Sequence, residues 1–84
     1  MNDNFKNGDL FRFKTSIPLF NLTYNKNNEG KIPQIDLSIY KHATINECGL
    51  FIGRDKNTYF FELLVNDNTC YISGQYLNDL EKIV

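Results

Sequence analysis

Residues 58–65 read TYFFELLV, and this stretch decides the fold class of the chain. Successive side chains of a β-strand point to opposite faces, and here both faces are mainly apolar. A strand that is apolar on both faces is typical of a closed barrel or a sandwich. Glu62 is the exception within the run. We interpret it as the point where the second face reaches solvent, rather than as a buried functional acid.

The segments that follow this strand are short and punctuated by turns. Asn66-Asp67-Asn68 predicts a hairpin turn, and residues 69–73 predict the returning strand. Residues 74–79 predict a short helical turn, with Tyr76 and Leu77 pointing back to the core. Residues 80–84 are then expected to close the sheet.

The segments that precede it also alternate. In residues 10–15, Phe11 and Phe13 share one face of an expected strand. After Pro33, the alternation of Ile35, Leu37 and Ile39 with polar residues predicts a half-buried strand. Strands are expected at 10–15, 35–39, 49–53, 58–65, 69–73 and 80–84, with a further apolar stretch at 17–24. The prediction is an all-β fold, a small antiparallel barrel of five or six strands with one short helical turn.

Composition limits the classes of function. The chain has 84 residues, enough for a single domain over 1–84, with 1–7 as an arm. Its net charge of −1 gives no support for a nucleic-acid partner, because such domains usually carry a basic excess. The sequence contains no apolar run long enough for a signal peptide or a membrane span. We therefore expect a cytoplasmic protein with reduced cysteines.

The residue types that carry catalysis are sparse. His42 is the single histidine, and Cys48 with Glu47 lies a few residues further on, without the surroundings of a known nucleophile motif. Cys48, Cys70 and His42 lack the paired spacing of a metal site. We expect no enzyme activity, no metal and no cofactor.

The segment CYISGQYL, residues 70–77, resembles the closing motif of Src-homology-three-like barrels, in which a strand leads into a one-turn helix that carries Tyr and then an aliphatic residue. The opening Gly8-Asp9-Leu10-Phe11 is instead similar to the KOW-type variant of these small barrels. The resemblance covers about half of the chain. It implies the barrel fold and, for the first family, a peptide site in which aromatic rings hold an extended segment.

Two functions follow as expectations. The first is a non-enzymatic protein-binding module that docks a partner through loop residues 24–34 and through Tyr24, Tyr59, Tyr76 and Glu29, of which Tyr76 matches the motif. An Asn-, Lys-, Ile- and Tyr-rich composition fits a phage or mobile-element protein that binds and modulates a host protein. The alternative is a KOW-type nucleic-acid-associated barrel that uses Arg12, Lys14 and Arg54. A homodimer paired through residues 80–84 is also compatible with either function.

Overall fold

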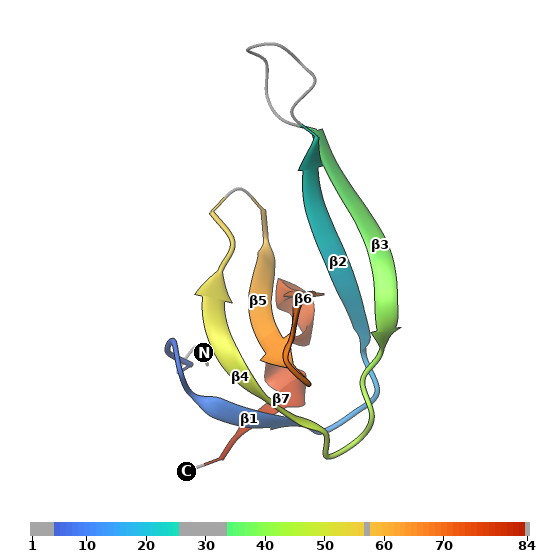
Figure 1. The fold of residues 1–84 in the computed structure, drawn as a ribbon. Helices are drawn as coiled ribbons and strands as arrows, with labels where there is room; N and C mark the ends of the chain where they lie inside the picture. Colours follow the sequence, from blue (N-terminus) through green and yellow to red (C-terminus); the bar gives the residue numbers. More distant parts are fainter. Residues whose placement is uncertain (1–4, 26–33, 57, 84) are drawn as a thin grey trace.

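The computed structural model describes residues 5–25, 34–56 and 58–83. Within these residues, seven antiparallel strands form one sheet in the order β3-β2-β6-β5-β4-β1-β7 (Figure 1). The elements are β1 (Leu10–Phe13), β2 (Pro18–Asn25), β3 (Gln34–His42), β4 (Cys48–Arg54), β5 (Phe60–Val65), β6 (Asn68–Ser73), the 3-10 helix η1 (Gly74–Asp79) and β7 (Leu80–Lys82). The predicted all-β class and the single helical turn are confirmed.

The sheet does not close on itself, because β3 and β7 lie at its two ends and do not pair with each other. The described residues also form seven strands rather than the expected five or six. The difference arises because the apolar stretch at 17–24 and the segment after Pro33 pair with each other as a hairpin. Among the residues that the structure describes, one registered pair, Phe20 with Tyr71, joins this hairpin to β6.

One face of the sheet carries the core. Phe11 and Phe13 of β1 are fully buried, as the alternation of that strand predicts, and their rings pack edge to face at 5.2 Å. The other completely buried large side chains are Leu19, Leu63, Val65, Cys70 and Ile72. Tyr76 and Leu77 of η1 pack against this cluster, which confirms the orientation expected for the helical turn.

The turns explain how the central strands meet. Asn66 and Asp67 both have positive φ, at 55° and 64°, which is the conformation of the two-residue turns that match the twist of a hairpin. The predicted turn therefore lies between β5 and β6, and Val65 pairs with Asn68 across it. Gly53 has φ +155° beside a register shift between β4 and β5, so it forms a β-bulge.

The half-burial expected for the strand after Pro33 is wrong. Leu37 is 45% exposed and Ile39 is 58% exposed, although both lie in β3. The reason is tertiary: β3 has a single neighbour, β2, and the hairpin extends beyond the ends of β4 and β5 (Figure 1). Leu19 and Leu22 of β2 are buried, whereas Leu37 and Ile39 on the outer strand of the hairpin stay exposed. In the same part of the chain, no helix is long and apolar enough to cross a membrane.

Candidate functional site

The tyrosines singled out from the sequence lie in different environments. Tyr59 is 78% exposed, and the Arg54 guanidinium lies 5.7 Å from the centre of its ring. Tyr76 is half-buried against the core. The two come from adjacent segments, because the N–H of Gly74, at the start of η1, donates to the Tyr59 carbonyl at 3.0 Å. Tyr24 lies in β2, opposite Ile35 of β3.

Other parts of the expected partner site lie outside the described residues. These are the side chain of Tyr24, all of Glu29 and most of the loop 24–34. The candidate site is therefore built from the remaining surface of the sheet.

The second face of the sheet carries an aromatic cluster that sequence reasoning did not single out. Phe20 of β2 lies opposite Tyr71 of β6, and Tyr71 lies opposite Glu62 of β5, so these three side chains share one face. Phe60 lies two residues before Glu62 and points to the same face. The rings of Phe20 and Phe60 meet edge to face at 5.6 Å. We call Phe20, Phe60 and Tyr71 the aromatic face.

The three aromatic side chains are only half-buried. The surrounding positions on this face are also apolar. Ile39 lies opposite Phe20 and Leu37 lies opposite Leu22, which extends the apolar surface onto the hairpin. On the other side, Leu10 and Leu64 flank Leu50 across three strands. Glu62 reaches solvent among these groups, as expected. This partly exposed apolar surface is the candidate site of interaction.

The stretch TYFFELLV already indicated a second apolar face on its strand. Its even-numbered residues include the apolar Phe60 and Leu64. Their burial requires a second layer on that face, which a single open sheet does not provide. Phe20 and Tyr71 were not identifiable in the same way, because their place beside Phe60 depends on the pairing of β2 with β6.

The basic candidates do not act as one group. Arg12 is paired with Glu81 at 2.9 Å, so much of its charge is compensated. Lys14 is exposed after β1, beside a mixed-charge hollow that also includes Glu81 and Lys82. Arg54 lies elsewhere, with Lys56, Thr58 and Tyr59 around a shallow hollow of about 260 Å³.

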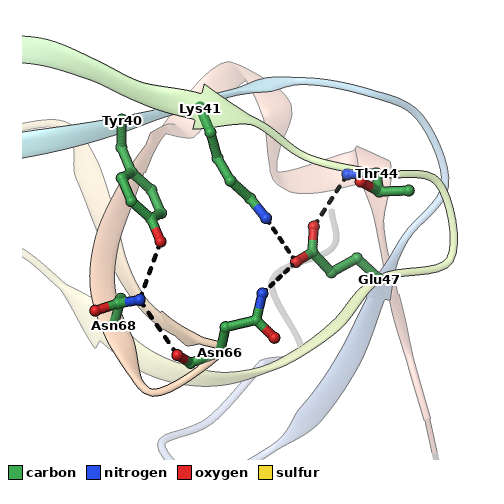
Figure 2. Close-up of polar contacts among 6 residues, drawn as sticks. All are labelled: Tyr40, Lys41, Thr44, Glu47, Asn66 and Asn68. Atoms are coloured by element: carbon green, nitrogen blue, oxygen red, sulfur yellow. Dashed lines mark hydrogen bonds and ion pairs between the residues drawn. The ribbon is translucent and has the colours of Figure 1, made fainter.

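The acid beside Cys48 has a structural environment. The Glu47 side chain is 12% exposed and accepts hydrogen bonds from Lys41 Nζ at 2.8 Å, Asn66 Nδ2 at 2.8 Å and the Thr44 N–H at 3.0 Å (Figure 2). Burial would raise the pKa of Glu47, but the three hydrogen bonds and the Lys41 charge outweigh it and lower that pKa. The hydrogen bond to Glu47 likewise raises the pKa of Lys41.

A second side-chain hydrogen bond lies beside the Asn66–Glu47 contact. Asn68 Nδ2, at the start of β6, donates to the hydroxyl of Tyr40 in β3 at 3.0 Å (Figure 2). Together with Glu47, this bond ties the base of the β2–β3 hairpin to the body of the sheet. These polar groups hold the β5–β6 turn and the segment around Glu47 against β3.

The cysteines differ in accessibility. Cys48 is exposed, and its Sγ donates to the Asn46 carbonyl at 3.6 Å. Cys70 is buried in the core, where desolvation raises its pKa to about 11. Both are free thiols. Among residues 5–25, 34–56 and 58–83, no three His, Cys, Asp or Glu side chains gather as metal ligands.

Comparison with known proteins adds no further constraint. The chain matches no family model, no curated protein and no solved structure.

Proposed function

We propose that this protein is a non-enzymatic protein-binding module that holds an extended segment of a partner on its aromatic face. One observation carries the proposal: Phe20, Phe60 and Tyr71 form a half-exposed aromatic cluster in the middle of the sheet. Aromatic side chains are enriched at the centres of protein interfaces, because each buries a large area with few rotatable bonds.

The surroundings of the cluster support an extended ligand. The apolar surface follows the strands onto the hairpin through the exposed side chains of Leu37 and Ile39. The exposed aromatic–cation pair of Tyr59 and Arg54 does not belong to this surface, because Arg54 lies opposite Phe61 on the other face of the sheet. The helical turn η1 also follows β6 directly, where the Src-homology-three resemblance puts it, with Tyr76 on it. In that family, rings beside this turn form the slots for an extended segment.

The test uses two neighbouring residues that point to opposite faces of β2. Phe20→Ser removes a ring of the aromatic face, whereas Asn21→Ser changes an exposed polar residue on the other face. Tagged wild type and both variants are incubated with extract of the source cells, and the retained proteins are identified by mass spectrometry. We expect the wild type and Asn21→Ser to retain the same partner and Phe20→Ser to lose it.

Circular dichroism of Phe20→Ser shows whether that loss reflects binding or unfolding. If the wild type retains nothing above background, or if the folded Phe20→Ser variant binds like the wild type, the proposal is overturned. A retained host protein would also support the narrower hypothesis of a cytoplasmic phage or mobile-element accessory protein that modulates its host.

A second candidate function is nucleic-acid binding, and the Arg54–Tyr59 pair favours it. A cation beside an exposed ring suits base stacking with phosphate contact. This function predicts retention on a nucleic-acid column at low salt, with affinity falling steeply as salt rises. Tyr59→Ser would weaken that retention while leaving the partner binding of the aromatic face in place. Passage of the wild type through the column at low ionic strength would exclude it.

A further inference from the structure

The two ends of the sheet are protected very differently. β7 has three residues, and its two charged side chains are in ion pairs, Glu81 with Arg12 and Lys82 with Asp9. Short, charged strands are the usual protection of a sheet edge. The expected dimer through residues 80–84 would have to form at this short, charged edge, which is unfavourable for pairing with another strand.

β3 has none of these protections along most of its length. It is nine residues long, and no described strand pairs with its outer edge. Its register with β2 is regular from Gln34 to Ile39, and the irregularity comes only beyond Ile39. Residues 34–39 contain no proline and a single charge, Asp36. A long, regular edge with exposed apolar side chains is a template for pairing with another strand.

The exposed part of β3 is symmetric in character. Apolar Ile35, Leu37 and Ile39 alternate with polar Asp36 and Ser38, so the pattern is the same from either end. A two-fold axis requires that each residue i facing residue j is matched by j facing i. A second copy of this chain satisfies that requirement in an antiparallel pair.

We propose that β3 pairs with β3 of a second copy, antiparallel and centred on Leu37. Leu37 then faces the second copy's Leu37, and each Ile35 faces an Ile39, which gives three apolar cross-strand pairs. Asp36 faces Ser38, so like charges do not meet. A register centred on Asp36 would place two carboxylates opposite each other, and one centred on Ser38 would leave only two apolar pairs and put Ile35 opposite Lys41.

The position of the hairpin allows this approach. β3 lies on the outside of the projecting hairpin, away from β4, β5 and β6 (Figure 1). Pairing would cover Leu37 and Ile39, which a single chain leaves 45% and 58% exposed. Because the two-fold axis is perpendicular to the sheet, the two aromatic faces would lie on the same side of one continuous sheet. The inference does not rest on the proposed function, since it concerns the isolated protein.

Disulfide trapping tests the register. In a Cys48→Ser background, Leu37→Cys places two thiols at the centre of the pair, where facing Cα atoms lie roughly 4.5–5.5 Å apart, within disulfide reach. The matched control is Ser38→Cys on the same exposed strand, whose copies would be about 8 Å apart in this register and out of reach. We expect a covalent dimer from Leu37→Cys under mild oxidation and little from Ser38→Cys. Equal cross-linking of both, or preferential cross-linking of Ser38→Cys, overturns the register.

Sedimentation tests the association itself. The wild type should sediment with twice the mass of the chain at high micromolar concentration. Leu37→Lys should raise the dimer dissociation constant by about tenfold or more, because two ammonium groups would meet at the axis. Thr23→Lys, on the polar face of β2, should leave the constant unchanged, and Leu37→Lys should keep the wild-type circular dichroism spectrum because Leu37 is exposed. A wild type that is monomeric at every concentration, or that adds only strands of other proteins to β3, refutes self-pairing.

Discussion

Replacing Glu47 by Gln tests whether the polar network in Figure 2 stabilises the fold. Gln keeps the shape of the side chain but removes its charge, and one of its two polar atoms becomes a donor. Lys41 Nζ and Asn66 Nδ2 both donate to Glu47 Oε2, and the Thr44 N–H donates to Oε1, so the Gln amide leaves either the first two donors or the Thr44 N–H without an acceptor. A hydrogen bond to a charged group is worth roughly 1.5–3 kcal/mol when water is excluded. Because water reaches Asn66 and part of Lys41, we expect a total cost of about 2 kcal/mol.

Thermal unfolding followed by circular dichroism measures this cost. For a domain of this size, about 2 kcal/mol corresponds to a fall in Tm of roughly 8–16 °C. The matched control is Glu81→Gln. Glu81 also forms an ion pair at 2.9 Å, but both side chains of that pair are nearly half exposed, so its loss should cost under about 1 kcal/mol. If Glu47→Gln lowers Tm no more than Glu81→Gln, burial of the network is not what stabilises the hairpin.

The pH dependence gives a second readout of the same prediction. The pKa of Glu47 is lower in the folded protein than in the unfolded chain. Its contribution to stability is therefore present above its unfolded pKa of 4.5 and is lost as the pH falls through its folded pKa. The difference in Tm between wild type and Glu47→Gln should shrink on going from neutral pH to about pH 3. A constant difference over this range would refute the role of the carboxylate charge.

Three further predictions follow from single positions. Because the pKa of Cys70 is raised from 9.0 to about 11, its neutral thiol contributes stability below pH 9 that is lost as the pH rises toward 11. In denaturant titrations, the free energy of unfolding of Cys70→Ala should therefore fall less steeply with alkaline pH than that of the wild type. A thiol reagent should modify only Cys48 until the protein unfolds. Gly49→Ala should destabilise by about 2 kcal/mol, because a Cβ there would lie 2.8 Å from both the Leu64 carbonyl oxygen and Phe11 Cζ; an unchanged midpoint in urea would contradict that packing. Asp67→Gly should stabilise by about 0.5–1 kcal/mol, since Gly adopts the positive φ of this turn without steric cost, and a lower Tm would count against the turn type.

Several parts of the fold could be predicted because they depend on short-range pattern. The alternation in β1 correctly assigns Phe11 and Phe13 to the core, and the turn at Asn66 and Asp67 follows from residues that tolerate positive φ. The helical turn with Tyr76 was equally local. The same kind of alternation failed for Ile35, Leu37 and Ile39, because periodicity shows that a strand has an apolar face but not whether anything lies against it.

The candidate site shows the same division. Tyr59 was chosen from the sequence and is exposed, whereas the aromatic face combines Phe20 with Phe60 and Tyr71. The residues of this cluster are up to 51 positions apart, from Phe20 to Tyr71, and meet only through the pairing of β2 with β6. Glu47 was considered as a partner of Cys48, yet its neighbours are set by the approach of the β5–β6 turn to β3.

By itself, the sequence determined that the chain is all-β, where its turns and its helical turn lie, and which face of β1 is buried, since these depend on propensity and on a period of two. The stretch TYFFELLV predicted apolar contacts on both faces of its strand, but the pattern did not identify the residues that make those contacts. Only the tertiary structure decided that the sheet stays open, that β3 is an edge and that the second face is half-exposed. The physical reason is that strand order depends on contacts between residues far apart in the chain, which no local pattern encodes.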